Sequence, residues 1–379
     1  MLRVPATAPS FSEEDIAFIT ERFKGILRGE SFLSMYVYGE EFEARFAAYT
    51  GTRHAVACNS GTSALELIFR AIGVEGREVI LPSNTFLATA IAVRNAGAIP
   101  VFADCGDDMS LDPDDAASRV TSNTAAIAQV HIGGVVSEGV RQTQQLCQDK
   151  GIHLVEDAAQ AHGSVLDGKK AGSFGTAAGF SFFSTKVMTT GEGGMVTTDD
   201  PDLVRRMKSD REFGKIRKGV YVNYHETFGY NWRMPEVSAL MGLRQLEALD
   251  SFIARRREIV AAYDELLCEV DDVTIVHPEG HASYNGFKYM IVLPHHDRVK
   301  VHREMDTMGI SPSGYIYEIP LHKLPVFPES NDLCLPKTEF ICRQHLCLPV
   351  FVGMSDEQVD YVAESLQKVL ANGDNRLSP

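Results

Sequence analysis

The 379-residue sequence has few cysteines and no long apolar run. Its 7 cysteines are an odd number and include no C-x-x-C pair, which argues against a disulfide framework and against a structural zinc site. No stretch approaches the roughly 18 apolar residues of a membrane span, and the N-terminus lacks the apolar core of a targeting segment. We therefore expect a soluble, cytoplasmic protein without a metal site.

Basic residues are fewer than acidic ones. The chain has 36 Lys and Arg and 51 Asp and Glu, which gives a formal net charge of −15. Such an acidic chain is a poor electrostatic partner for nucleic acid or for an anionic membrane, so we expect neither. One local basic cluster does occur, at Arg205, Arg206, Lys208, Arg211, Lys215, Arg217 and Lys218. It fits a solvated helix face or the entrance for an anionic substrate, and the sequence leaves both readings open.

Apolar runs typical of strands alternate with helical patterns along most of the chain. Strands are predicted at 78–81, 99–102, 125–130, 152–155, 178–182 and 194–198. Strands separated by helices need crossover connections, which indicates a mostly parallel sheet.

A long helix is predicted from Val237 to about Val270, and we place a domain boundary inside it. This divides the chain into a large domain, 1–250, and a smaller α/β domain, 251–379, with one strand at 289–293. Residues 372–379 are expected to be disordered.

Lys186 follows a predicted buried strand and precedes a glycine-rich turn. Among aromatic and β-branched neighbours, desolvation would lower the pKa of its amine and make it nucleophilic. A lysine that forms a Schiff base needs this property. The alternative is a lysine that merely snorkels from the end of a strand.

Asp157 stands at the end of another predicted strand. At the carboxyl end of a parallel strand, an aspartate points into the crevice where open α/β sheets bind ligands. Pyridoxal phosphate (PLP) needs a carboxylate that keeps its ring nitrogen protonated, so that the ring can accept electrons. Taken alone, Asp157 also fits a helix cap or a turn. Paired with Lys186, it becomes a cofactor candidate.

The segment 59–72 predicts a helix whose N-terminus could hold a phosphate. Apolar residues recur there at helical spacing, and Ser63 begins a capping-box pattern. The free N–H groups and positive dipole end of a helix suit an anion, and Gly61 lets it approach the backbone. The hydroxyls of Ser60 and Thr62 offer further donors. An ordinary capped helix is the alternative reading.

Together these motifs resemble the DegT/DnrJ/EryC1/StrS family of PLP-dependent aminotransferases, which act mainly on keto sugars. The resemblance covers nearly the whole chain, and its segments follow the family's order: 38–57, 59–72, 82–90, 156–163, 180–194, 229–234, 320–322 and 348–349. It implies fold type I of PLP-dependent enzymes. We therefore expect a large domain with a mostly parallel seven-stranded sheet and a smaller C-terminal α/β domain.

The resemblance also implies roles for individual residues. Lys186 would form the Schiff base with the cofactor and shuttle a proton, while Asp157 would pair with the ring nitrogen. The implied cofactor contacts are Gln160 to the ring hydroxyl, Phe86 stacked on the ring, and Gly61, Thr62 and Ser181 on the phosphate.

Three further positions are assigned through the same resemblance. Asn231 would reach the phosphate of the neighbouring subunit's cofactor, which implies a homodimer with shared active sites. His322 and Tyr317 are the candidate sugar contacts. His162 is a weaker candidate, because a lone histidine is more often structural.

The implied reaction is transfer of an amino group from L-glutamate to a keto sugar for amino-sugar and polysaccharide biosynthesis. Some family members dehydrate the sugar and carry histidine where this chain has Lys186, so lysine favours transamination. A nucleotide-linked keto-deoxyhexose is the expected acceptor. The alternatives are an unactivated keto or aldehyde sugar such as an oxidised octulosonate, a keto-cyclitol with glutamine as donor, and a non-enzymatic regulator built on the same fold.

Overall fold

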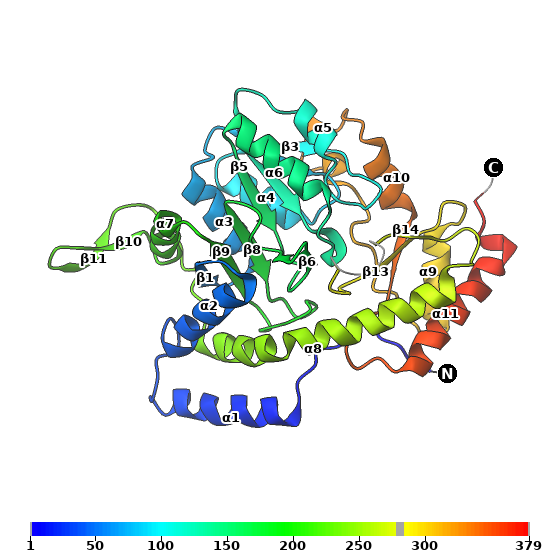
Figure 1. Cartoon of the computed structure of the whole chain (residues 1–379), viewed down its shortest axis with the longest axis horizontal. Helices are drawn as coiled ribbons and strands as arrows, with labels where there is room; N and C mark the ends of the chain where they lie inside the picture. Colours follow the sequence, from blue (N-terminus) through cyan, green and yellow to red (C-terminus); the bar gives the residue numbers. More distant parts are fainter. Residues whose placement is uncertain (1, 278–283, 378–379) are drawn as a thin grey trace.

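A central sheet of seven strands organises the computed structural model, which describes residues 2–277 and 284–377 (Figure 1). In spatial order the strands are β1 (His54–Cys58), β9 (Gly194–Thr198), β8 (Ala177–Ser181), β5 (His153–Asp157), β4 (Thr124–Val130), β2 (Glu78–Pro82) and β3 (Ile99–Ala103). The pairs from β8 to β3 are parallel, and β9 runs antiparallel to both its neighbours. The predicted mostly parallel seven-stranded sheet is confirmed. Six of its strands were predicted from the sequence, and β1 was not.

Helices cover both faces of this sheet, which explains why most of its strand residues are buried. In β2, Val79 and Leu81 pack into one hydrophobic cluster and Ile80 packs into the opposite one. One face is covered by α2 (Val37–Thr50), α5 (Pro113–Ser118), α6 (Gly139–Lys150) and the first half of α8 (Glu236–Leu267). The other face is covered by α3 (Gly61–Ile72), α4 (Leu87–Asn95) and α7 (Pro201–Arg211).

A smaller antiparallel sheet lies toward the C-terminal end of α8, in the order β12 (Thr274–Ile275), β13 (Tyr289–Val292) and β14 (His345–Leu348). With it are α9 (Arg298–Thr307), α10 (Pro336–Gln344) and α11 (Asp356–Ala371). The remaining elements are α1 (Glu13–Leu27), the short pair β6 (Val165–Leu166) and β7 (Lys169–Lys170), and the hairpin β10 (Lys215–Lys218) and β11 (Tyr221–His225). Figure 1 shows this hairpin projecting from the body of the molecule.

The long helix α8 contributes to two separate hydrophobic cores. Leu243 and Leu249 pack with the large sheet, whereas Val260 and Tyr263 pack with β13, β14 and α11. This change of core supports the boundary at residue 250, which stays a prediction. None of the helices within the described ranges is long and apolar enough to cross a membrane.

Two local predictions were wrong. The helix α3 begins at Gly61, because the Ser60 hydroxyl accepts a hydrogen bond from the N–H of Ser63 and caps the helix three residues before the predicted cap, Ser63. The C-terminal residues 372–377 are ordered, not disordered. Asn375 is buried, donates to the Val369 carbonyl and accepts from the N–H of Asp297. Residues 378–379 lie outside the described residues.

Candidate functional site

A pocket of about 360 Å³ lies where β5 and β8 end and α3 begins. This is the carboxyl edge of the parallel strands, where open α/β sheets place their ligand sites. The lining residues are Ser60, Gly61, Thr62, Leu65, Phe86, Ala88, Asp157, Ala159, Gln160, Ser181, Phe183, Thr185, Lys186, Glu192 and Tyr317. Eight of the predicted site residues therefore meet in one cavity, counting Gly61, Thr62, Phe86, Asp157, Gln160, Ser181, Lys186 and Tyr317.

Lys186 presents its amine in this pocket. Burial lowers the pKa of the amine to about 8, the Asp157 carboxylate opposes that shift, and the charge of Lys288 adds to it. The side chain keeps part of its exposure because it lines the open cavity. The lowered pKa gives Lys186 a substantial neutral fraction near physiological pH, as a nucleophilic lysine requires.

Asp157 is held by two hydrogen bonds at the end of β5. Its Oδ2 accepts from the hydroxyl of Thr89 at 2.7 Å, and its Oδ1 accepts from the N–H of Ala159 at 3.2 Å. The residue is 6 % exposed and lines the pocket. A carboxylate offers about four acceptor sites, so positions remain for a donor inside the cavity.

The N-terminus of α3 forms one end of the pocket, directly beside Ser181 of β8. A Cβ added to Gly61 would meet the Cβ of Ser181 at 2.6 Å, so only glycine fits this contact. The Ser60 hydroxyl uses its acceptor on Ser63, and Thr62 lies in the first turn. Backbone N–H groups and the hydroxyls of Ser60 and Thr62 therefore lie at the helix N-terminus, where the positive end of the helix dipole stabilises a bound anion.

Phe86 leaves an apolar ring uncovered beside these polar groups. The residue is 61 % exposed although it lines a pocket, and its ring centre lies 6.0 Å from that of Tyr317 with the planes 33° apart. Exposed aromatic faces in a cavity are typical of sites that stack a flat ligand.

Two hydrogen bonds orient the side chain of Gln160, which accepts one of them and donates the other. Its Oε1 accepts from the N–H of Gly133 at 2.8 Å, and its Nε2 donates to the Tyr317 hydroxyl at 2.8 Å. Burial raises the pKa of Tyr317, and the nearby Asp157 carboxylate acts in the same direction, so the phenol stays protonated. Because its oxygen already accepts from Gln160, the Tyr317 O–H is left as a donor.

Three predicted residues lie outside this pocket. Asn231 is exposed and makes a bridge to Glu212. His322 is fully buried, and its ring nitrogens contact the Ser83 hydroxyl at 2.7 Å and Glu339 at 3.1 Å. This placement gives no support to a sugar contact by His322, and that role stays a prediction.

His162 is also buried behind the pocket. Its ring packs 5.4 Å from that of Phe180 and 5.6 Å from that of Phe182. Burial lowers the pKa of His162 to about 3, and the charge of Lys186 acts in the same direction. The imidazole is therefore neutral at physiological pH and serves the packing around the lysine segment.

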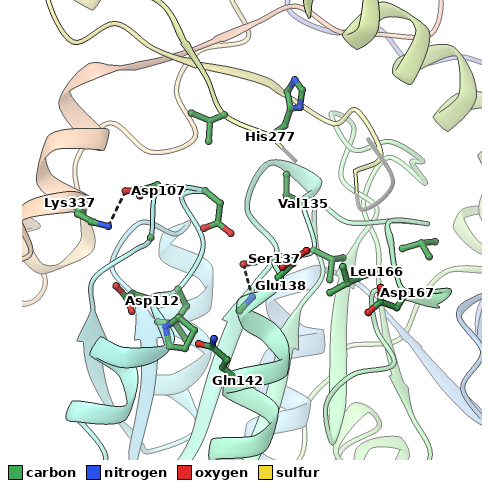
Figure 2. Close-up of a pocket in the computed structure, with 18 of the residues that line it drawn as sticks. Asp107, Asp112, Val135, Ser137, Glu138, Gln142, Leu166, Asp167, His277 and Lys337 are labelled. Atoms are coloured by element: carbon green, nitrogen blue, oxygen red, sulfur yellow. Dashed lines mark hydrogen bonds and ion pairs between the residues drawn. The ribbon is translucent and has the colours of Figure 1, made fainter. Parts of the chain in front are cut away.

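A larger cavity, of about 860 Å³, lies elsewhere, between the loops that follow the sheet and the segment around His277 (Figure 2). Its charged lining is mostly acidic, including Asp112 and Glu138, and its Lys337 is paired with Asp107 at 2.9 Å. None of the predicted site residues lines this cavity, so the smaller pocket is the better candidate.

The residues of the smaller pocket fit PLP. The cofactor needs an amine with a lowered pKa, a carboxylate, an aromatic face and an anion site, and one cavity offers all four. Lys186, Asp157 and Phe86 supply the first three, and the start of α3 with Ser181 supplies the fourth. Gly61 is the sharpest match, because a side chain there would collide with Ser181 and separate the two segments that form the anion site.

Sequence reasoning missed Thr89, which holds Asp157 in place. The signal for it was weak but present. Thr89 follows Phe86 by three residues at the start of a helix, a spacing that puts both on one side. Since Phe86 was expected to face the cofactor, the hydroxyl of Thr89 could have been expected to point toward the same site.

Comparisons with known proteins agree with this geometry. A model of the DegT/DnrJ/EryC1/StrS aminotransferase family matches residues 13–367. A GDP-perosamine synthase of Caulobacter vibrioides is 35% identical over 336 residues, which cover 87% of this chain and 89% of that protein.

Two further proteins extend the match to almost full length. A dTDP-4-dehydro-2,3,6-trideoxy-D-glucose 4-aminotransferase of Saccharopolyspora spinosa is 34% identical over 388 residues, 98% of each chain. The solved structure of Helicobacter pylori PseC, an aminotransferase involved in the biosynthesis of pseudoaminic acid, superposes with a TM-score of 0.90. It is 26% identical and covers 98% of this chain and 100% of that chain.

Proposed function

Because this chain belongs to the DegT/DnrJ/EryC1/StrS aminotransferase family and is a PLP-dependent transaminase, we propose that it transfers an amino group from L-glutamate to a nucleotide-linked keto-deoxyhexose. The observation that carries the proposal is the single cavity that joins Lys186, Asp157 and the N-terminus of α3.

When bound, PLP supplies the carbonyl that carries the amino group and the ring that accepts electrons. The proposed work of the chain is to hold that ring and to move protons around it. Lys186 would hold the cofactor through its neutral amine and would carry a proton at Nζ. Asp157 would hold a proton at the ring nitrogen through its carboxylate oxygens. Phe86 would cover one face of the ring and fix its plane.

The identity of the acceptor is supported by the relatives. The two curated proteins compared above are named for GDP- and dTDP-linked sugars. A diphosphate acceptor and a dicarboxylate donor are both anionic, yet Lys186 is the one basic residue among those that line the pocket. Further basic groups must therefore reach the cavity from outside its lining.

We propose that a second copy of the chain supplies them. The projecting hairpin carries Lys215, Arg217 and Lys218 on β10, and Asn231 follows it on an exposed segment. Large exposed apolar side chains accompany these charges, as in protein interfaces. They are Val220, Tyr221, Val222 and Phe228 near the hairpin, and Phe32 and Leu33 near α1. These features support a homodimer with shared active sites.

A panel of acceptors tests the proposal. The purified holoenzyme is incubated with L-glutamate and, in turn, a GDP-linked and a dTDP-linked 4-keto-6-deoxyhexose, an unactivated keto sugar and a keto-cyclitol, and release of 2-oxoglutarate is measured. We expect turnover with a nucleotide-linked sugar and none with Lys186→Ala. Equal turnover of the unactivated sugar, or turnover only with glutamine as donor, would contradict the proposed substrates.

A further inference from the structure

Thr89 is a fully buried residue in the first turn of α4, and its hydroxyl donates to Oδ2 of Asp157 at 2.7 Å. A hydroxyl carries one proton, and a carboxylate only accepts. The second contact of this hydroxyl, 3.1 Å from the Oγ1 of Thr85, must then be donated by Thr85. The hydrogen bonds therefore run in one direction, from Thr85 through Thr89 to Asp157.

Thr89 is not among the residues that line the pocket, whereas Asp157 is. Any effect of its hydroxyl on a bound ligand must therefore pass through the carboxylate. Together with the N–H of Ala159 on Oδ1, the hydroxyl on Oδ2 fixes the rotation of the carboxylate about its Cβ–Cγ bond. The acceptor sites that remain are those that face the cavity.

The same turn of helix also places the aromatic face. The N–H of Thr89 donates to the carbonyl of Phe86 at 3.1 Å, and Phe86 is the residue that caps α4. The ring of Phe86 and the carboxylate of Asp157 are thus held by one short segment, 85–89. Phe86 would therefore set the plane of a flat ligand, and the hydroxyls of the same segment would set the orientation of the Asp157 carboxylate toward that ligand.

We propose that Thr89, supported by Thr85, is a positioning residue for the transaminase, which holds the Asp157 carboxylate in the orientation that directs it at the ring nitrogen of PLP. The proposal rests on the proposed function, because it requires Asp157 to be the partner of that nitrogen. Because one donor occupies an acceptor site on each carboxylate oxygen, the carboxylate cannot rotate away from that nitrogen without losing a hydrogen bond. Lys186 and Tyr317 interact electrostatically with Asp157, and Glu192 is a further ionisable residue of the pocket lining.

The test compares Thr89→Val, which keeps the shape and removes the hydroxyl, with Thr89→Ser, which keeps the hydroxyl. Thr143→Val serves as the matched control, since Thr143 is an equally buried threonine whose hydroxyl lies 3.2 Å from Gln129. Asp157→Asn sets the scale of the full effect. For each holoenzyme, the visible absorbance of the bound cofactor is titrated with pH, the dissociation constant of PLP is measured, and kcat and KM are determined.

We expect Thr89→Val to lower kcat about tenfold, the usual effect of one charge-assisted hydrogen bond, with KM little changed. Its absorbance midpoint should move in the same direction as that of Asp157→Asn, but by less. Thr89→Ser should restore both values, and Thr143→Val should alter neither. Thr85 is one hydrogen bond further from the carboxylate, so Thr85→Val should move the absorbance midpoint in the same direction by a smaller amount. If Thr89→Val does not fold, the midpoint of Thr85→Val tests the inference in its place.

A Thr89→Val enzyme with the wild-type absorbance midpoint and kcat, beside an altered Asp157→Asn enzyme, would overturn the inference and leave the proposed function standing. An Asp157→Asn enzyme that keeps the wild-type midpoint and kcat would overturn the role of Asp157 itself. A change of equal size in Thr143→Val would show a general packing effect and would also overturn the inference.

Discussion

Gly61 and Ser181 approach so closely that a Cβ on Gly61 would lie 2.6 Å from the Cβ of Ser181. The first turn of α3 and the end of β8 therefore form one wall of the pocket. Both segments are fixed by the hydrogen bonds of their own helix and sheet, so neither can yield cheaply to an added side chain.

Substitution of Gly61 tests this wall. In Gly61→Ala the first turn of α3 must move away from β8, and such overpacking costs about 1–3 kcal/mol. We expect the affinity of the apoprotein for PLP to fall roughly tenfold or more, as measured by quenching of protein fluorescence. Gly353→Ala is the control, because nothing lies within 4 Å of a Cβ at that position. Equal affinities of the two variants would be evidence against the phosphate site.

The rate at which PLP attaches covalently to the apoprotein should depend on pH through Lys186. Only the neutral amine attacks, and its pKa of about 8 lies below the ordinary lysine value of 10.5. The rate should therefore rise as pH increases through about 8 and level off above it. Stopped-flow absorbance gives the midpoint, and Lys186→Ala should show no covalent attachment. A midpoint near that of an ordinary lysine would contradict the burial of the amine.

Lys288 should tune that midpoint, because its positive charge lowers the pKa of Lys186. Lys288→Met removes the charge, so the midpoint should move to higher pH. Lys170→Met is a suitable control, since the Lys170 amine donates to the Tyr49 carbonyl outside the pocket lining. The same measurement applies, and a shift toward lower pH in Lys288→Met would show that the two charges do not interact as described.

Tyr317 and Gln160 should act as a coupled pair. Tyr317→Phe removes the acceptor of the Gln160 amide and should weaken PLP binding several-fold, consistent with about 1 kcal/mol for one hydrogen bond. Gln160→Ala should cost more, because it also removes the proposed contact to the ring hydroxyl. In the double variant the losses should be less than additive. Four dissociation constants complete the cycle, and strictly additive losses would mean that the pair is independent.

Shared active sites predict complementation between inactive variants. Lys186→Ala and Asn231→Ala should each be inactive alone, because each lacks one part of every site in a dimer. A mixed dimer should contain one intact site and regain activity after co-refolding. Activity of the mixture is compared with that of each parent. Full activity of a monomer, seen by sedimentation at assay concentration, would rule out the proposed contribution of Asn231.

The sheet was predictable because its signal is local and strong. Each strand is a short apolar run between turns, and burial on both faces makes that run continuous, as in Ile80 with its neighbours Val79 and Leu81. The long helix was predicted over 237–270 and found at Glu236–Leu267, since its apolar spacing persists over many turns. The roles of the individual site residues stay predictions, although most of these residues share one cavity.

Two features escaped prediction because side-chain partners, rather than residue spacing, decide them. The capping-box pattern predicted a helix start at Ser63, whereas Ser60 caps α3. Ser63 instead donates its hydroxyl proton to Asn59. The bond from Thr89 to Asp157 joins residues 68 positions apart, so the spacing of Thr89 from Phe86 could indicate the side of the helix but not the carboxylate partner.

The continuous helix α8 has a consequence for how the protein melts. Its 32 residues, about 48 Å of helix, belong to the core of the large sheet at one end and to the core around β13 and β14 at the other. If either core unfolds, the apolar residues on half of this helix lose their packing partners, and the packing of the other half is weakened. The two cores are therefore expected to unfold in one calorimetric transition, and a cut in the chain within α8 would separate that transition into two.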